Sequence, residues 1–517
     1  MKMTKYKLSE LVEVTRGASL SGQFYAEEGK LIRLTLGNFN MNGGGFKKNT
    51  SKTDLYFTGT VRDEFILNEG DIITPLTEQS LGLLGTTARI PESGKYIQSQ
   101  DVALIRCKKG LLDPNFCYYL ISSSIVRQQL SAAAQQTKIR HTSPEKIKDC
   151  TVWVPDFDVQ KNIGRILTDI DNKIAINRQI NDNLEAMAKQ LYDYWFVQFD
   201  FPNEEGKPYK SSGGTMVYNE KLKREIPQGW DSSMLQSICT IKRGASPRPI
   251  DDFMDESHKG MPWVKISDAT NSNSPFMTTI KEHIILDGVP KSVKVIPNTL
   301  IVSNSATPGI PKFIQIEACV HDGWLVLTDY QEIYKYYLYY VIKMIRHNLL
   351  HIASGSIFKN LKTDYLKEFI CITPSTEILS KYHNLVKPIM QEILLLQRDT
   401  EVLTKQRDEL LPLLMNGQAS VNYHLSASTS ISFDISVLFL NFTNGNSLYE
   451  TISLDYQCFA LPLHSKENTH GTIQEDKRHI QQRQRQGDKH ARERFLAFFY
   501  KCTSTIHQAA FGYAWCY

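Results

Sequence analysis

Two long stretches of the chain carry apolar residues at every third or fourth position, which is the spacing of one face of an α-helix. The stripe residues assigned to a helix interface are Ile170, Ile174, Leu184 and Leu191 in the first stretch, and Ile393, Leu403 and Leu410 in the second. A helix of roughly 35 to 40 residues is about 50 to 60 Å long, which is more than one domain of this size can bury. The pattern therefore predicts that the two helices bury each other as an antiparallel coiled coil, with Asn177 as the polar residue that fixes its register. Two amphipathic helices, each packed on its own domain, remain the alternative.

Shorter apolar alternations predict strands, and they recur in the second half of the chain. LVEVTRGAS at 11–19 is matched by ICTIKRGAS at 238–246, and NEGDIITP at 68–75 is matched by PNTLIVSN at 297–304. The longest match aligns QTKIRHTSPEKIKDCTVWVP at 136–155 with GSIFKNLKTDYLKEFICITP at 355–374 without a gap, and it continues into both helical stretches. The fold class is therefore expected to be α+β/α, with two α/β domains separated by two long antiparallel helices in a pseudo-two-fold internal repeat.

The repeat also sets the expected domain boundaries. The first globular domain is placed at 1–155, its helix at 156–200, a linker at 201–230, the second globular domain at 231–375 and its helix at 376–418. The remaining segment, 419–517, has no counterpart in the repeat from about 427 onwards. It mixes a short apolar run with a polar, basic run, and we expect it to be disordered or poorly packed.

The segment LYDYWFVQFDFPNEEGKPYKSSGGTMVYNEKLKREIPQGW, at 191–230, joins the two halves. It resembles the central conserved region of type I restriction-modification specificity subunits and the entry to their second target-recognition domain. RDELLPLLMNGQ, at 407–418, resembles the end of the distal conserved region of the same family. The resemblance extends from residue 1 to about residue 426.

This resemblance implies two target-recognition domains that each bind one half of an interrupted, asymmetric site in double-stranded DNA. It also implies partners: two modification subunits, which methylate adenine with S-adenosylmethionine, and restriction subunits, which use ATP and Mg²⁺. The chain itself is expected to be a non-catalytic subunit that binds no cofactor and no metal. A self-sufficient restriction endonuclease and a coiled-coil scaffold that binds no DNA remain the alternatives.

Composition narrows the class of protein without identifying it. The chain is 41% hydrophobic and 22% charged, which is typical of a soluble globular protein, and it has no apolar run long enough to cross a membrane. Without a secretory signal at its start, a cytoplasmic location is expected. Nine scattered cysteines lack the paired spacing of a zinc site. The formal net charge of +4 is weak support for a nucleic-acid partner.

The sequence lacks the motifs that the associated enzymes need. It has neither the Asn/Asp-Pro-Pro-Tyr/Phe motif of adenine methyltransferases nor a phosphate-binding loop for ATP. Pro155-Asp156 followed by Asp171 and Lys173 imitates the spacing of a metal-dependent nuclease. Asp171 and Lys173 lie two positions apart in an expected helix and therefore point to different faces, so we reject the nuclease interpretation.

Candidate DNA contacts are basic or amide residues in the turns and loops that the two repeats share. They are Arg16, Lys47, Lys48, Lys138 and Arg140 in the first repeat, and Lys242, Arg243, Arg248, Lys359 and Asn360 in the second. Residues at shared positions are expected to contact the DNA backbone, and residues where the repeats differ are expected to read bases. Solvated surface charge is an equally open interpretation for each of them. Trp195 and Phe196 either pack against the other helix or a domain, or form the docking site for a modification subunit.

Overall fold

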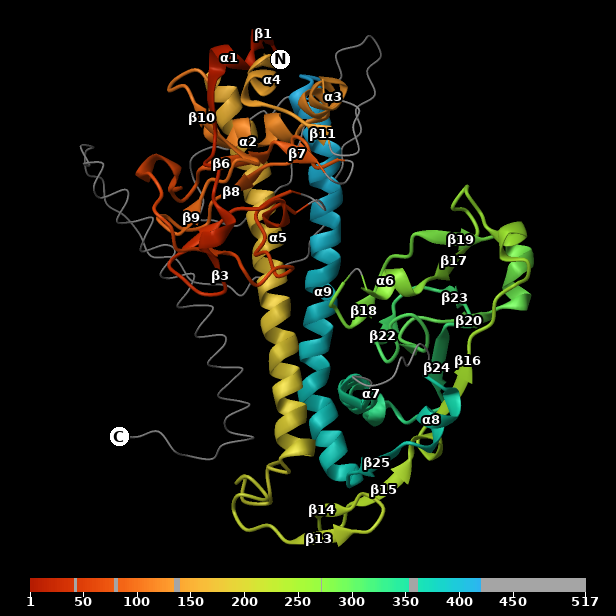
Figure 1. Cartoon of the computed structure of the whole chain (residues 1–517). Helices are drawn as coiled ribbons and strands as arrows, with labels where there is room; N and C mark the ends of the chain where they lie inside the picture. The colour runs from red at the N-terminus through yellow and green to blue at the C-terminus, as the bar shows by residue number, and fades with distance from the viewer. Residues whose placement is uncertain (41–43, 79–81, 134–139, 271, 353–360, 420–517) are drawn as a thin grey trace, which may run out of the picture. The chain divides into compact units, whose positions relative to one another are not determined.

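The computed structural model describes residues 1–40, 44–78, 82–133, 140–270, 272–352 and 361–419, apart from the side chains of 348–352 (Figure 1). These residues form two units. Unit 1 comprises the described residues of 1–176 and 400–419, and unit 2 comprises those of 177–399. Lys138, Lys359, Asn360 and nearly all of the 419–517 segment lie outside the described residues.

Unit 1 contains two small sheets and two strand pairs, β1-β12 and β7-β11. The first sheet is antiparallel and has the order β2-β10-β6-β8, and the second has the order β3-β5-β4-β9, in which β4 and β9 are parallel. Its strands are β1 (Thr4–Lys7), β2 (Val12–Arg16), β3 (Tyr25–Ala26), β4 (Leu31–Arg33), β5 (Tyr56–Phe57), β6 (Ile72–Pro75), β7 (Thr77–Glu78), β8 (Ala88–Arg89), β9 (Tyr96–Ile97), β10 (Val102–Cys107), β11 (Arg140–His141) and β12 (Thr151–Val154). Its shorter helices are α1 (Leu8–Leu11), α2 (Pro114–Ser122), α3 (Ser124–Ala133) and α4 (Pro144–Lys148).

Unit 2 also contains two sheets, ordered β16-β24-β21-β22-β18 and β19-β17-β23-β20, together with the pairs β13-β14 and β15-β25. Its strands are β13 (Met216–Asn219), β14 (Arg224–Pro227), β15 (Asp231–Met234), β16 (Thr240–Arg243), β17 (Met261–Val264), β18 (Phe276–Met277), β19 (Glu282–Ile284), β20 (Val293–Val295), β21 (Leu300–Ser303), β22 (Pro311–Ile314), β23 (Ala318–Val320), β24 (Trp324–Thr328) and β25 (Ile370–Thr373). Its shorter helices are α6 (Ile266–Thr270), α7 (Lys335–Ile352) and α8 (Thr363–Glu368).

The two units share a strand order, as the repeated sequence features lead us to expect. The run β16-β24-β21-β22 repeats β2-β10-β6-β8, the parallel pair β17-β23 repeats β4-β9, and β15-β25 repeats β1-β12. Each Arg-Gly-Ala-Ser sequence begins at the last residue of a strand, β2 or β16, and turns the chain out of the first sheet. The longest sequence match corresponds to a short helix followed by a strand, α4-β12 in unit 1 and α8-β25 in unit 2.

Both apolar stripes lie in long helices, α5 (Phe157–Tyr192) and α9 (Thr376–Met415). In unit 1, Ile170 and Ile174 form a buried cluster with Leu403, against which Leu410 packs. In unit 2, Asn177 is 5% exposed and its Nδ2 donates to Asp399 Oδ2 at 2.8 Å. Farther along α5, Asn181 Nδ2 donates to the carbonyl oxygen of Ile393 at 3.3 Å, so the two helices run antiparallel.

The same helices also pack on the sheets, so the two arrangements considered from the sequence are not exclusive. Ile163 and Leu167 of α5 join the core of unit 1 beside Phe116 and Leu120. Ile393 belongs to the large core of unit 2, and Leu184 and Leu191 pack against it. The apolar face of each helix therefore packs against both the other helix and the core of a domain, because it is wide enough to contact both.

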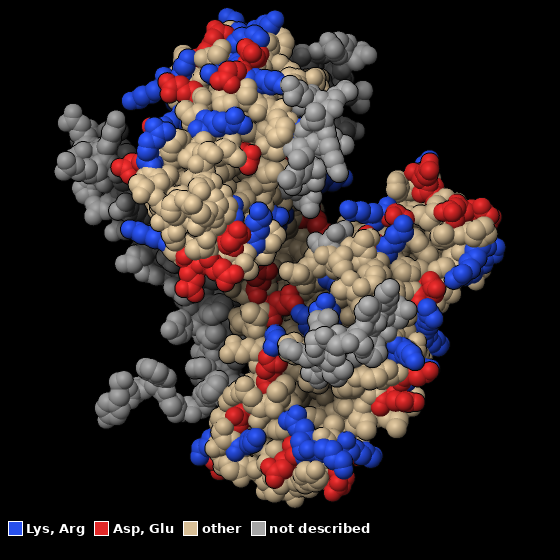
Figure 2. Space-filling view, viewed as in Figure 1, with Lys and Arg blue, Asp and Glu red and all other residues tan. Residues whose placement is uncertain are grey.

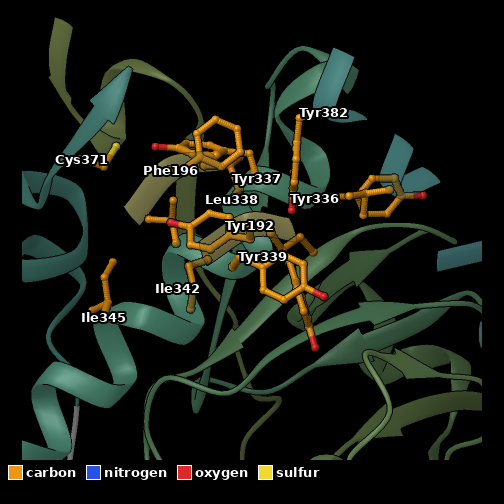
Figure 3. Close-up of a cluster of buried hydrophobic side chains, with 14 of the residues drawn as sticks. Tyr192, Phe196, Tyr336, Tyr337, Leu338, Tyr339, Ile342, Ile345, Cys371 and Tyr382 are labelled. Carbon is orange, nitrogen blue, oxygen red and sulfur yellow. The ribbon is translucent and has the colours of Figure 1, made fainter. Parts of the chain in front are cut away.

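The aromatic residues that end α5 lie in the core of unit 2 (Figure 3). Trp195 and Phe196 stand in a π-helical turn, Asp193–Val197, and are 0% and 2% exposed. The ring of Phe196 lies 4.9 Å from that of Tyr337 on α7 and 4.8 Å from that of Tyr382 on α9. Of the two roles considered for Trp195 and Phe196, their burial favours packing inside the unit, because little of either ring is left for a partner to cover.

The segment expected to be a linker, 201–230, has secondary structure of its own. Strands β13 and β14 pair as a hairpin, with Met216 opposite Pro227. Phe201 stacks on Trp230 with ring centroids 4.9 Å apart, and both side chains are buried in the core of unit 2. The repeat could not predict this hairpin, because the segment has no counterpart elsewhere in the sequence.

Candidate DNA interface

The two Arg-Gly-Ala-Ser turns are held by the same contacts in both units. Arg16 Nε donates to the carbonyl oxygen of Gln100 at 2.9 Å, and Arg243 Nε donates to that of Asp322 at 2.7 Å. A Cβ on Gly17 would lie 2.2 Å from the carbonyl oxygen of Gln98. In the second turn, a Cβ on Gly244 would lie 2.2 Å from the carbonyl oxygen of His321. Arginine and glycine therefore recur here because each holds the turn, which the repeated sequence alone does not reveal. Both arginine side chains nevertheless stay largely exposed.

Replacing Gly17 with alanine should destabilise unit 1 by about 1 to 3 kcal/mol, because the added methyl group would collide with backbone atoms that cannot move independently. Gly22→Ala is the matched control, since its new Cβ would meet no atom closer than 3.8 Å. Urea-induced unfolding of the two variants measures the difference. Equal stability of both variants would contradict this account of the turn.

The remaining described candidates in unit 1 differ in how strongly the unit itself holds them. Lys47 and Lys48 are exposed. Arg140 is partly buried; its Nη1 lies 3.4 Å from Glu78 Oε2 and donates to Ser131 Oγ at 3.1 Å. Glu78 is buried and accepts a hydrogen bond from the backbone N–H of Leu83 at 2.8 Å. Arg140 therefore has an intramolecular role, which makes it a weaker candidate for DNA than the two lysines.

In unit 2, two of the candidate cations, Arg243 and Arg248, lie beside one carboxylate. Asp322 Oδ2 lies 3.5 Å from Arg248 Nη2 and 3.8 Å from Arg243 Nη2, and Asp322 Oδ1 accepts from Ser246 Oγ at 2.9 Å. Burial alone would raise the pKa of Asp322, but the Ser246 hydrogen bond and the nearby charges outweigh it, so the pKa is lowered. Asp322 is therefore ionised at neutral pH. Lys242, the other candidate in this turn, is exposed.

A groove of about 800 Å³ opens beside this carboxylate, and its lining includes Arg248, Lys265, Ser305 and His321. Burial lowers the pKa of His321, against the opposing effect of Asp322, so the ring is neutral at pH 7. His321 Nδ1 accepts a hydrogen bond from the backbone N–H of Gly323 at 2.8 Å. The ring proton must then be on Nε2, which makes that atom a hydrogen-bond donor.

Asp171, which imitates a nuclease carboxylate in the sequence, belongs to a packing network in unit 1. Arg407 Nη1 donates to Asp171 Oδ1 at 2.8 Å, and Tyr119 Oη donates to Asp171 Oδ2 at 2.7 Å. Among the described residues, no group of three or more His, Cys, Asp or Glu side chains is arranged to hold a metal ion. Across the same part of the chain, no helix is both long and apolar enough to cross a membrane.

The charges on the surface are mixed. In Figure 2, Lys and Arg side chains are interspersed with Asp and Glu side chains over the visible face of both units. A surface of this kind provides several small basic areas for phosphate contacts, and it fits the formal net charge of +4. Affinity for a polyanion would therefore depend on local geometry more than on total charge.

Comparisons with known proteins agree with this architecture. A family model described as the type I restriction modification DNA specificity domain matches residues 1–186 and 227–398. The type I restriction enzyme MjaIX specificity subunit of Methanocaldococcus jannaschii is 24% identical over 322 residues, which cover 61% of this chain and 71% of that protein. The HindI specificity subunit of Haemophilus influenzae is 24% identical over 378 residues, covering 62% of this chain and 81% of that protein. Among solved structures, the S subunit of a type I system from M. genitalium aligns with a TM-score of 0.52 at 17% identity, covering 80% of this chain and 96% of that one.

Proposed function

The chain belongs to the type I restriction-modification DNA specificity family, and we propose that it selects an asymmetric, two-part DNA site for the modification and restriction subunits of such a system. Each unit binds one half of the site, and the two halves are separated by a fixed gap. The proposal rests on one observation above all. Two units with the same strand order carry different residues around the same turn, so one chain supplies two related but unequal DNA-reading domains.

The paired helices supply the spacing in this proposal. We take α5 and α9 to form a coiled coil that relates the two repeats by an approximate two-fold axis. Polar contacts along the pair, such as Asn177 with Asp399 in unit 2, favour a single register over sliding of one helix along the other. A single register would give a single gap length between the two half-sites.

The DNA contacts proposed from the sequence fall into two groups. Arg16 and Arg243 occupy equivalent turns, and their exposed guanidinium ends would contact phosphates while Nε holds the turn. Lys47, Lys48, Lys242 and Arg248 stand at positions where the repeats differ or the loops are exposed, and they would add phosphate or base contacts. Lys138, Lys359 and Asn360 remain proposals from the sequence alone.

We assign no catalytic step to this chain. Two modification subunits would supply S-adenosylmethionine and methylate adenine, and restriction subunits would supply ATP-driven, Mg²⁺-dependent cleavage. The alternative of a self-sufficient nuclease loses its best sequence support, because Asp171 is engaged by Arg407 and Tyr119 in unit 1. The alternative of a scaffold that binds no DNA is tested by the experiment that follows.

Single-molecule sequencing of DNA from a host that expresses this chain with its modification subunit tests the function directly. We expect methylated adenine in one interrupted, asymmetric motif, and no such motif in a host that expresses the modification subunit alone. Methylation at the same sites without this chain would overturn the proposal. DNA cleavage by the purified chain with Mg²⁺ alone would favour the nuclease alternative.

The isolated chain should bind DNA weakly and discriminate its site poorly, whereas the complex with modification subunits should bind tightly and specifically. The physical reason is the small basic surplus of the chain, since phosphate contacts supply much of the affinity of DNA-binding proteins. Titrations with the methylated motif and with a scrambled duplex, at two salt concentrations, measure affinity, specificity and salt dependence. A lone chain that discriminates as well as the complex would contradict this expectation.

A further inference from the structure

The groove beside the second Arg-Gly-Ala-Ser turn has a composition that suits the edge of a base pair. Its lining includes the buried apolar side chains of Trp263 and Ile266, which we call its floor, and the exposed charged groups of Arg248 and Lys265, which we call its rim. In the major groove, guanine presents two acceptors side by side and thymine presents a methyl group. A cationic rim over an apolar floor can contact both kinds of group.

The strand register allows the two units to be aligned residue by residue at this place. Ala103 of β10 lies opposite Arg16, and Leu325 of β24 lies opposite Arg243. Counting back along the chain from this pair, Asp322 corresponds to Gln100. Asp322, which holds the two arginines of unit 2, therefore has an uncharged counterpart in unit 1.

The two cations of the groove also have uncharged counterparts. Counting forward from the turn arginines, Arg248 corresponds to Ser21. In the parallel pairs, Trp263 lies opposite Cys319 as Arg33 lies opposite Ile97, which aligns Lys265 with Thr35. Positively charged groups have thus been placed in unit 2 at positions where the other repeat has hydroxyls.

One wall of the groove differs between the units as well. Ile301 of β21 lies opposite Lys312, whereas the equivalent Ile73 of β6 lies opposite Ala88, so the connection after β21 is four residues shorter than the one after β6. In unit 1 the longer connection includes the buried carboxylate of Glu78, which lies beside Arg140. In unit 2 the methyl group of Ala306 lines the groove, with a φ of 56° that alanine adopts at some cost.

The Arg248 side chain is oriented by an ion pair and is still exposed enough to contact DNA. Its side chain is 80% exposed, and Asp322 Oδ2 lies 3.5 Å from its Nη2. A surface ion pair of this kind contributes little to folding, but it restricts the directions in which a long side chain points. A restricted guanidinium loses less conformational entropy on binding, and its fork of donors matches the O6 and N7 acceptors of guanine.

We propose that this groove of unit 2 reads bases of the second half-site, with Arg248 contacting a guanine and Asp322 positioning Arg248. His321 and Ser305 also line the groove, and the His321 Nε2–H and the Ser305 hydroxyl are further hydrogen-bond donors of these residues. Lys265, whose Nζ lies 2.5 Å from Glu282 Oε2, is the second cation of the rim. This inference rests on the proposed function, because it assumes that unit 2 binds one half of a divided site.

The test compares the methylated motifs of hosts that express the modification subunit with the wild-type chain, Arg248→Ala or Asp322→Asn. Arg248→Ala should relax one G·C position of the second half-site by roughly 10- to 100-fold, leaving the first half-site and the gap unchanged. Asp322→Asn keeps an acceptor for Ser246 and should relax the same position to a smaller degree. Arg62→Ala is the matched control, because Arg62 is 75% exposed and paired with Glu64 at 3.0 Å in unit 1. It should leave the whole motif intact.

Selection of bound duplexes from a randomised pool, with the assembled complex, gives the same information for any variant that does not methylate. An unchanged motif, a uniform loss of affinity at all sequences, or loss of preference at every position of the second half-site would each overturn the inference. None of these results would affect the proposed function. That function fails separately if the wild-type complex produces no interrupted motif.

Discussion

Inserting one heptad into each long helix should lengthen the gap of the methylated motif by about three base pairs. Seven helical residues add about 10 Å, and base pairs are spaced 3.4 Å apart. The insertion points are between Ile176 and Asn177 in α5 and between Asp399 and Thr400 in α9, so the contacts within each unit are preserved. Both half-sites should keep their sequences, because neither set of sheets is touched.

The matched control inserts the same heptad into α5 alone. It would shift one helix against the other and could not satisfy the pairing of Asn177 with Asp399 and of Asp171 with Arg407 at the same time. We expect this variant to lose stability and methylation. Single-molecule sequencing reads the motif, and selection of bound duplexes reads the gap if methylation is lost. An unchanged gap in the double insertion would contradict the spacer role of the helices.

Replacing Arg407 with methionine should destabilise unit 1 by about 3 kcal/mol. Arg407 is buried, and its removal would leave the Asp171 carboxylate with Tyr119 Oη as its remaining partner in this network. A partly buried charge without a counterion costs more than the lost packing, because methionine fills most of the same volume. Urea-induced unfolding, followed by helix circular dichroism, measures the change.

Two variants separate charge from packing in this experiment. Lys405→Met removes an exposed cation of the same helix that lies 3.9 Å from Glu409, and it should cost less than about 0.5 kcal/mol. The double variant Arg407→Met with Asp171→Asn should recover part of the loss, because the partly buried Asp171 charge is removed and the asparagine oxygen still accepts from Tyr119. Asp408, which also pairs with Arg407 at 2.8 Å, is 59% exposed, so water can solvate its charge in both variants. If the double variant is less stable than Arg407→Met alone, the carboxylate is not the source of the cost.

The sequence anticipated the architecture best where the signal is periodic and local. Every third or fourth residue of α5 and α9 is apolar, and Ile174, Leu403 and Ile393 are buried at the positions that this period marks. Asn177 was expected to be a polar residue in that interface, and it is buried there beside Asp399. The hairpin β13-β14 was not anticipated, because a segment that occurs once offers no second copy to compare.

The candidate DNA residues show that a shared position in the repeat does not reveal what a side chain contacts. Arg16 and Arg243 were chosen for their shared position, but the shared feature proves to be a hydrogen bond from Nε to a carbonyl of the neighbouring strand connection. Arg140 was chosen for the same reason, and it lies against Glu78 instead. Lys138, Lys359 and Asn360 lie outside the described residues, so their DNA contacts remain predictions.

By itself the sequence determined that the chain is a duplicated unit with long paired helices, since periodicity and repetition depend only on the order of side chains along the backbone. The tertiary structure decided which distant residues meet. Asp322 meets Arg248 and Arg407 meets Asp171 because strand register and helix register bring them together. The groove that we assign to base reading exists for the same reason: it is lined from several elements of unit 2, and its lining differs from unit 1 at single positions such as Arg248 and Lys265. No local pattern encodes such a site, because its members are ordinary core or surface residues of separate segments until the sheets bring them together.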